Sequence, residues 1–253
     1  MAIEFRGKPG IVVYLTAGDP GLAATRAIAL AAIDAGADVI ELGVPFSDPL
    51  ADGPVIQRAS ERAVGRGVRL VDVLGLAGEV RAARPSAGLV LFSYLNPVVR
   101  LGMREFCVRA AAAGVDGVLL TDMIVEEAAE YLDAMQEAKL QPVFLAAPTS
   151  TDKRLEAIAK VSQGFVYAIS RVGITGTQDR VEGGAKELVT RLRRFTTMPI
   201  AVGFGISNAE HVRAVGEFAD AAILGSAIVA LIERSEPGDE PRAVGEFIRG
   251  LRA

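Results

Sequence analysis

The sequence has very few of the side chains that bind soft metals or form disulfides. It contains one cysteine, Cys107, and one histidine, His211, among 253 residues. One cysteine excludes an internal disulfide framework and is typical of a reducing compartment. One histidine and one cysteine also exclude a metal site built from several such ligands. His211 lies in a helical pattern beside charged residues, so we expect it on the surface.

Lysine is also scarce, and none stands where a strand is expected to end. A Schiff-base aldolase needs a lysine in its active site, so this class of enzyme is disfavoured. The lysines are Lys8, Lys139, Lys153, Lys160 and Lys186.

Long runs of basic residues and long runs of apolar residues are missing too. The formal net charge is −4 and no basic run is present, so nucleic acid is not an expected partner. The start of the chain has no apolar segment of the kind found in signal peptides. The longest apolar run, Ala221 to Ile232, is too short to cross a bilayer. We therefore expect a cytoplasmic protein that binds neither membrane nor nucleic acid.

Apolar residues, by contrast, make up 51% of the chain, which is enough for a large core. Strand-like runs alternate with helical patterns eight times, as in a closed parallel barrel, and about 250 residues is the usual length of such a domain. We expect an α/β protein: a single (β/α)8 TIM barrel over residues 1–253, with extra short helices. The runs begin near Ile11, Val39, Leu89, Gly117, Pro142, Phe165, Ile200 and Ala221.

Apolar residues at helical spacing predict the intervening helices. They are expected over Gly21 to Ala35, Val55 to Arg66, Leu70 to Arg84, Met103 to Ala113, Ile124 to Ala138, Thr151 to Val161, Ala185 to Phe195, Asn208 to Val215, Ser226 to Glu233 and Glu240 to Ala253.

A weak internal repeat supports the cyclic arrangement. AGADVIELG at residues 35–43 is echoed by AGVDGVLLTD at 113–122 and by EFADAAILG at 217–225. In each, a helix ends, a short turn carries an aspartate, and an apolar strand begins. A doubly wound open sheet is the alternative, but no Gly-rich dinucleotide fingerprint follows the first strand.

The stretch VIELGVPFSDPLADGPVIQ, residues 39–57, places carboxylates at and after the end of a strand. Glu41 interrupts an otherwise apolar run. Burying an unpaired carboxylate costs several kcal/mol or raises its pKa, and a raised pKa suits a general acid or base near neutral pH. The alternatives are a paired, non-catalytic charge for Glu41, a turn or helix cap for Asp52, and a turn for Asp48.

Glycines gather in the loops expected after the last three strands, where this type of barrel often binds phosphate. Bare backbone next to a helix N-terminus offers free N–H groups and a favourable dipole to an anion. Tight turns are the alternative explanation. The residues concerned are Gly173, Gly176, Gly203, Gly205, Gly225 and Ser226.

Apolar and aromatic side chains are expected at the remaining strand ends. Core packing explains each one singly, but together they could line a flat pocket between the carboxylates and the phosphate site. Such a pocket implies a ligand with an aromatic end and a phosphate end. The residues are Phe92, Tyr94, Leu119, Leu145, Phe204 and Ile223.

Four segments carry a resemblance to a known family. ELGVPFSDPLADGP closely resembles the signature of the tryptophan synthase α subunit, and SRVGITG, VGFGIS and LGSAIV match that family in the same order. The resemblance runs from about Gly10 to about Glu233. It implies a retro-aldol cleavage of indole-3-glycerol phosphate to indole and glyceraldehyde 3-phosphate, with no cofactor in this chain.

The same resemblance implies a role for each site residue. Glu41 would be the acid–base residue, Asp52 would accept the ring N–H, and Tyr167 would help to position Glu41 and the substrate. Thr175 would lie on a loop, Arg171 to Gly184, that closes over the site. The implied phosphate-binding residues are Gly176, Gly205, Gly225 and Ser226.

A partner is implied as well: a pyridoxal-phosphate-dependent β subunit, in an α2β2 heterotetramer. The loop with Pro45 and Asp48 and the region of Asn96 would face it. Met123 and Ile124 stand where the family usually has Leu or Val followed by Pro, which puts contacts near the fourth strand in doubt.

Two other functions stay open. One is a stand-alone indole-glycerol-phosphate lyase, with the same fold and reaction but no β partner. The other is a non-catalytic subunit that only activates the β subunit, although the presence of both Glu41 and Asp52 argues against it.

Overall fold

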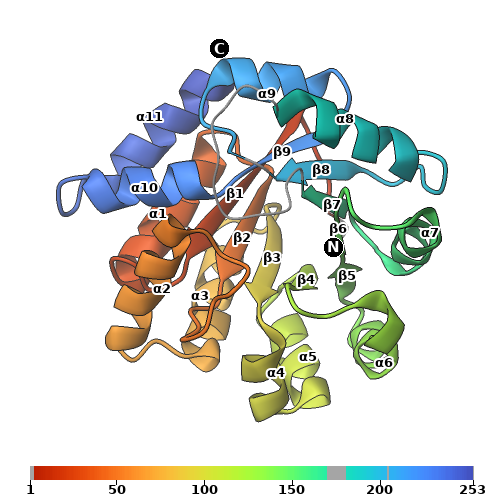
Figure 1. Cartoon of the computed structure of the whole chain (residues 1–253). Helices are drawn as coiled ribbons and strands as arrows, with labels where there is room; N and C mark the ends of the chain where they lie inside the picture. Colours follow the sequence, from red (N-terminus) through yellow and green to blue (C-terminus); the bar gives the residue numbers. More distant parts are fainter. Residues whose placement is uncertain (1–2, 170–180, 204, 253) are drawn as a thin grey trace.

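The chain folds into a nearly closed barrel of parallel strands surrounded by helices (Figure 1). The computed structural model describes residues 3–169, 181–203 and 205–252. Within these ranges, nine strands form one sheet in the order β5-β4-β3-β2-β1-β9-β8-β7-β6. The strands are β1 (Gly10–Thr16), β2 (Val39–Gly43), β3 (Gly88–Ser93), β4 (Gly117–Leu120), β5 (Gln141–Val143), β6 (Leu145–Ala146), β7 (Val166–Ile169), β8 (Ile200–Gly203) and β9 (Ala221–Leu224).

The barrel closes at the fifth predicted strand, which the structure divides into β5 and β6 around Phe144. β5 pairs with β4 and β6 pairs with β7, so this short stretch changes partner at its midpoint. The carbonyl of Phe144 accepts a hydrogen bond from the Tyr167 amide and carries the pairing across the break. The eight-strand prediction is therefore confirmed.

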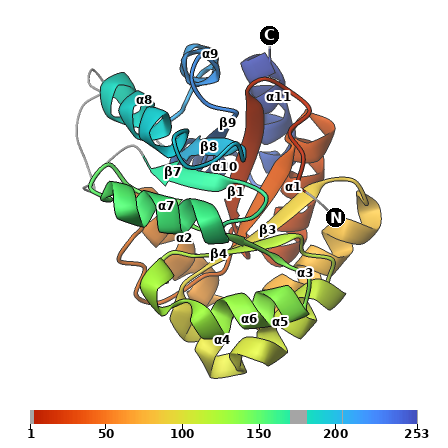
Figure 2. The same cartoon turned by 90° about the vertical axis from the view of Figure 1, so that its right-hand side faces the viewer.

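Helices cover the outside of the barrel (Figures 1 and 2), and the first helix, α1, packs against the last, α11. Of the helices in the described ranges, none has both the length and the apolar character needed to span a bilayer. They are α1 (Leu22–Asp34), α2 (Pro54–Gly65), α3 (Leu70–Ala83), α4 (Leu95–Leu101), α5 (Met103–Ala112), the 3-10 helix η1 (Val125–Glu127), α6 (Ala129–Glu137), α7 (Asp152–Val161), α8 (Val181–Leu192), α9 (Ala209–Gly216), α10 (Ser226–Arg234) and α11 (Glu240–Arg252).

Three helices differ from the sequence prediction. The helix predicted over Ile124 to Ala138 is divided into the 3-10 helix η1 and helix α6. Helix α4 was not predicted, because it is short and contains Pro97; a proline is tolerated there because the first-turn N–H groups have no partner within a helix. Helix α8 begins at Val181 instead of Ala185, so the end of the predicted 171–184 loop is helical. Burial of the apolar face of α8 outweighs the low helix propensity of Gly183 and Gly184.

Side chains alternate between the two sides of the barrel wall. Ile40 and Leu42 of β2 point outward into the core beneath the helices, whereas Val39 belongs to a separate cluster inside the barrel. Ile3 and Phe5 fill the end of this inner cluster where the strands begin, with the Phe5 ring 5.9 Å from that of Phe165. The inside of the barrel is therefore plugged by apolar side chains at the end where the strands begin.

The internal repeat corresponds to a repeated contact at the plugged end. Its three aspartates precede β2, β4 and β9, and each accepts a hydrogen bond from a backbone N–H near the start of a neighbouring strand. Each also pairs with an arginine: Arg252 of α11, Arg81 of α3, and Arg193, which directly follows α8. The sets are Asp38–Ile11–Arg252, Asp116–Leu89–Arg81 and Asp220–Ile200–Arg193.

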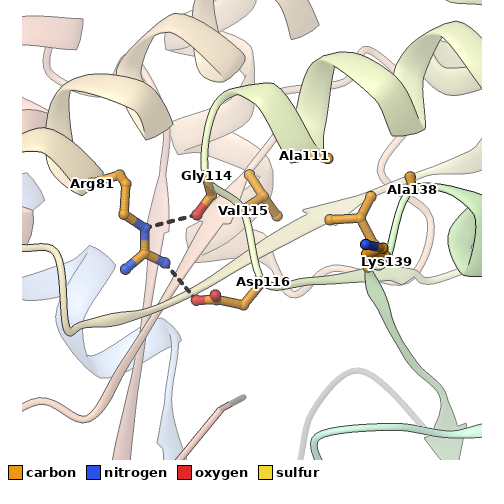
Figure 3. A pocket seen from close by; sticks show the side chains of 8 residues that line it. Arg81, Ala111, Gly114, Val115, Asp116, Ala138 and Lys139 are labelled. Atoms are coloured by element: carbon orange, nitrogen blue, oxygen red, sulfur yellow. Dashed lines mark hydrogen bonds and ion pairs between the residues drawn. The ribbon is translucent and has the colours of Figure 1, made fainter. Parts of the chain in front are cut away.

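Figure 3 shows the arginine and the aspartate of the second set, Arg81 and Asp116, from close by. Arg81 donates to the carbonyl of Gly114 at 2.8 Å and to the carboxylate of Asp116 at 2.6 Å. The small cleft beside them, which Lys139 also lines, lies at the end of the barrel away from the C-terminal ends of the strands.

Candidate active site

Glu41 is a fully buried carboxylate in the wall of the barrel. Within β2 it lies in register with Tyr14 of β1 on one side and Val90 of β3 on the other. Neither carboxyl oxygen has a hydrogen-bond partner among the described residues. Burial raises the pKa of Glu41 from 4.5 to about 8. At neutral pH the carboxyl is therefore mostly protonated and able to act as an acid.

A buried carboxyl without partners is rare in native proteins, because an unsatisfied polar group costs free energy. A structural role would pair Glu41 with an arginine or a lysine, as Asp116 is paired at the other end of the barrel. Glu41 has no such pair within the described ranges. The arrangement therefore favours a chemical role over the alternative of a paired strand-end charge.

Asp52 is a second buried carboxylate, held by the loop that follows β2. Its amide donates to the carbonyl of Pro49 and fixes a turn, and the residue is 8% exposed. The hydroxyl of Tyr94 donates to Asp52 Oδ2 at 3.0 Å, and the amide of Ala51 donates to Tyr94 Oη at 2.9 Å. Burial raises the pKa of Asp52 to about 6, and the Tyr94 hydrogen bond opposes this rise.

Asp48 behaves differently, as the turn interpretation expects. It is exposed, and its carboxylate accepts from the neighbouring Ser47 hydroxyl. Asp48 therefore lies outside the buried site that contains Glu41 and Asp52.

The predicted apolar lining gathers on the inner face of the barrel. Phe92, Leu119, Leu145, Ile223 and Tyr167 all belong to the inner cluster, although Leu119 and Ile223 are buried and the others are partly exposed. Tyr94 lies apart from this group, on Asp52. Phe204, Thr175 and Gly176 lie outside the described residues, as does the predicted loop up to residue 180.

Two tyrosines bring hydroxyl groups toward the carboxylates. The pKa of the Tyr167 phenol is raised, mainly by burial and to a smaller extent by the negative charges of Glu41 and Asp52. Tyr14 was not singled out from the sequence, because in GIVVYLT it reads as one more core residue. The alternation of β1 places it on the inner side with Val12, while Val13 faces the helices. That alternation was the one signal that could have identified it.

The candidate phosphate site lies at the start of α10. Gly225 is the residue before the helix and Ser226 is its first residue; Ser226 is exposed. The first-turn N–H groups of a helix of this length are available to an anion. Gly205 follows β8 with φ +46°, a conformation that favours glycine. Its position is open, with no heavy atom within 4 Å of a built Cβ among the atoms described.

No group of three or more His, Cys, Asp or Glu side chains within the described ranges is placed to hold a metal ion. His211 is partly exposed, and its amide donates to Asn208, which caps helix α9. The chemistry that the site offers is that of two carboxyl groups with separated pKa values, together with phenol hydroxyls.

Comparisons with known proteins agree with this geometry. The family profile of the tryptophan synthase alpha chain matches residues 2–248. The tryptophan synthase alpha chain of Solibacter usitatus is 50% identical over 233 residues, covering 92% of this chain and 87% of that protein. The corresponding chain of Burkholderia lata is 44% identical over 252 residues, covering 100% and 93%.

Solved structures give the same answer. A chain from the tryptophan synthase α2β2 complex of Pyrococcus furiosus superposes with a TM-score of 0.91 at 37% identity, covering 98% of this chain and 99% of that one. Tryptophan synthase subunit alpha from Legionella pneumophila gives a TM-score of 0.88 at 34% identity, covering 96% and 91%. The barrel, the buried carboxylates at its open end and these matches together place the chain in the tryptophan synthase alpha chain family.

Proposed function

We propose that this chain is a lyase that cleaves indole-3-glycerol phosphate to indole and glyceraldehyde 3-phosphate. The observation that carries the proposal is Glu41: a fully buried carboxyl with a pKa of about 8 and no partner among the described residues, at the open end of the barrel. A retro-aldol cleavage of this substrate needs an acid that is protonated near neutral pH and becomes a base once it has donated.

Glu41 begins the reaction by donating its proton to C3 of the indole ring, which becomes a positively charged indolenine. The resulting carboxylate takes the proton of the side-chain hydroxyl next to the ring. The bond from C3 to that carbon breaks, its electrons return to the ring, and the hydroxyl oxygen becomes the aldehyde oxygen. Glu41 ends protonated, ready for another cycle.

Asp52 supplies the negative charge that this intermediate needs. With a pKa of about 6 it is mostly ionised at neutral pH, where Glu41 is mostly protonated. The ionised carboxylate accepts the ring N–H and stabilises the positive charge of the indolenine. Two carboxyl groups in one site thus take opposite roles because their environments separate their pKa values.

The rest of the site binds the substrate. Tyr167 positions Glu41, and the inner side chains Phe92, Leu119, Leu145 and Ile223 face the indole ring, with Tyr94 beside Asp52. Backbone N–H groups at Gly225 and Ser226, together with Gly205 in the loop after β8, bind the phosphate. Phe204, Thr175 and Gly176 complete the proposed set, and these lie outside the described residues.

A pyridoxal-phosphate-dependent β subunit is the proposed partner, in an α2β2 assembly, and this chain itself is proposed to carry no cofactor. The named α2β2 complex among the similar structures supports this assembly. Asp48 and Asn96 are exposed and available to the partner, as is Leu50, which is 85% exposed. Pro45 itself is buried, so the exposed residues of this loop, such as Asp48 and Leu50, would make the contact.

The decisive experiment measures indole release from indole-3-glycerol phosphate with and without a tryptophan synthase β subunit. The proposal expects slow turnover alone and faster turnover in the complex. Equally fast turnover without β would favour the stand-alone lyase. Turnover absent in both conditions, together with activation of β, would favour the non-catalytic subunit.

The departure from the family at Met123 and Ile124 can be examined in the same assay by restoring the usual family residues. Ile124 is 44% exposed.

A further inference from the structure

Tyr14 and Glu41 are direct neighbours on adjacent strands of the barrel. The parallel pairing of β1 with β2 sets the two residues in register, so their side chains leave the same side of the wall. The Tyr14 ring is 5% exposed and packs edge-on against Phe92, with ring centroids 5.2 Å apart. This packing fixes the ring and therefore the direction of its hydroxyl.

The hydroxyl of Tyr14 lies over Gly43, two residues beyond Glu41 on β2. A Cβ built on Gly43 would be 2.3 Å from Tyr14 Oη, so the ring occupies the space that any larger residue would fill. Tyr167 repeats this arrangement over Gly203 of β8, where the corresponding distance is 2.4 Å. Each of these two tyrosine rings thus packs over a glycine of the neighbouring strand, in space that a larger residue would fill.

Tyr14 has an unused hydrogen-bond donor. Thr16 Oγ1 donates to Tyr14 Oη at 3.4 Å, which occupies one lone pair of the phenol oxygen. Within the described ranges, the Tyr14 O–H donates to no acceptor. The carboxyl oxygens of Glu41, its register neighbour, are buried acceptors that lack a donor within the same ranges. An unused donor and unused acceptors therefore belong to two residues that are register neighbours on the inner side of the barrel.

We propose that Tyr14 is a positioning residue for Glu41. The Tyr14 hydroxyl donates a hydrogen bond to the Glu41 carboxylate whenever Glu41 has given up its proton. This rests on the proposed function, in which Glu41 alternates between acid and base. The ionised state is the costly one inside the barrel, because burial penalises the charged form. A hydrogen bond from Tyr14 is stronger to the carboxylate than to the neutral carboxyl, so it lowers the cost of the ionised state and aims the carboxylate for the second proton transfer.

The surroundings favour Tyr14 as a donor throughout the working pH range. Burial raises the pKa of its phenol well above the ordinary value, and the charges of Asp52 and Glu41 raise it further. The titratable groups near Glu41 come from several elements: Tyr14 of β1, Tyr167 of β7, and Asp52 with Tyr94 at the mouth. Tyr94 already donates to Asp52. Tyr14 and Tyr167 are thus the hydroxyls left for Glu41 among the described residues.

The test compares Tyr14→Phe with Tyr131→Phe in the full chain. Tyr131 is also buried, and its hydroxyl donates to the carbonyl of Val118 behind the barrel wall, so its loss is a matched structural control. The pKa of Glu41 is followed by carbon-13 NMR of labelled glutamate, with the signal assigned by its absence in Glu41→Gln. Losing a hydrogen bond to the charged form should raise the Glu41 pKa by about one unit in Tyr14→Phe. Tyr131→Phe should leave it unchanged.

Activity gives a second measurement. We expect kcat for indole-3-glycerol phosphate to fall about tenfold in Tyr14→Phe, with KM within about twofold of the parent value. The limb of the pH profile that reports Glu41 should move to higher pH. Fluorotyrosine at position 14, a stronger donor, should move the Glu41 pKa down and so distinguishes hydrogen bonding from a change in packing.

An unchanged Glu41 titration in Tyr14→Phe would overturn the proposal, as would equal shifts in Tyr14→Phe and Tyr131→Phe. If the parent chain showed no cleavage of indole-3-glycerol phosphate, with or without a β subunit, the proposed function would fail. The NMR titration would still decide whether Tyr14 serves the Glu41 carboxylate, so the two failures are distinguishable.

Discussion

The hydroxyl of Tyr94 donates a hydrogen bond to Asp52 Oδ2 at 3.0 Å, and this contact joins the end of β3 to the loop after β2. The backbone amide of Ala51 donates to the same phenol oxygen. The bond fixes a loop carboxylate at the mouth of the barrel and opposes the rise in pKa that burial causes. Tyr94 therefore affects the protonation of Asp52.

The Tyr94→Phe variant tests this relationship. Without the donor, the ionised form of Asp52 loses stabilisation, so its pKa should rise above about 6. Less Asp52 is then ionised at pH 6 to 7, and the acid limb of kcat/KM should move to higher pH. The measurement is the pH profile of indole release. A profile with its acid limb in place would mean that the hydrogen bond positions the ring but does not tune Asp52.

Glu41→Gln keeps the size of the side chain and removes its titration. We expect turnover to fall about 10²–10⁴-fold, the range for lost acid–base catalysis. Affinity for a substrate analogue should survive, because the apolar and phosphate contacts are unchanged. Asp48→Asn, at the exposed carboxylate of the same loop, is the matched control and should leave turnover of the isolated chain unaffected. Near-normal turnover in Glu41→Gln would refute the acid–base assignment.

The same substitution should change how stability depends on pH. The folded-state pKa of Glu41, about 8, lies above the ordinary 4.5, so the folded protein retains a proton that the unfolded chain releases. Between these values the group lowers stability as pH rises, and its effect is complete above about pH 8. Glu41→Gln should therefore lose less stability than the parent between pH 5 and 8. Denaturation curves at several pH values measure the free energy of unfolding of both proteins. If it depended on pH in the same way in the parent and in the variant, the pKa of Glu41 would not be raised.

The aspartates at the plugged end of the barrel should contribute to stability according to their burial. The side chains of Asp38 and Asp116 are each 3% exposed and that of Asp220 is 38% exposed. Asp38→Ala and Asp116→Ala leave an arginine and a buried N–H without their partner, and each should cost about 2–4 kcal/mol. Asp220→Ala should cost less. Urea denaturation measures the loss in the free energy of unfolding for each variant. An Asp220 variant as unstable as the other two would contradict this prediction.

Gly43→Ala should displace the Tyr14 ring, because the added methyl would be 2.3 Å from its hydroxyl oxygen and 2.5 Å from Cζ. The ring is held by Phe92 on its other side, so the variant should lose both stability and turnover. Gly53→Ala is the control: Gly53 has φ −74° and no atom within 4 Å of its built Cβ. Comparable kinetics in the two variants would show that the position of the Tyr14 ring is unimportant.

Gly225→Val tests the phosphate site. A Cβ at Gly225 would be 3.8 Å from Ile56 and 3.9 Å from Tyr14, which is ordinary contact, so the Cβ itself meets no clash, and a denaturation curve of the variant checks the fold. The side chain would cover the first N–H groups of α10, and KM should rise about tenfold or more with a smaller effect on kcat. Inhibition by glycerol phosphate gives the affinity directly, and an unchanged inhibition constant would count against this site.

The sequence alone determined the barrel and the carboxylates. Eight apolar runs separated by helical patterns leave few architectures, because parallel strands need crossover helices and a core on both faces. Glu41 could be identified because a carboxyl in an apolar strand is chemically conspicuous. The family resemblance then supplied the expected roles, including those of residues that no periodicity distinguishes from core.

Only the tertiary structure decided which side chains meet. Tyr14 looks like any core aromatic until the β1–β2 register places it beside Glu41, and Tyr94 becomes a partner of Asp52 only when two loops converge. Helix α8 starts earlier than its glycines predict, since burial of its apolar face outweighs local propensity. Local pattern fixes which way a residue faces, but register and loop geometry arise from contacts between distant segments and fix what it faces.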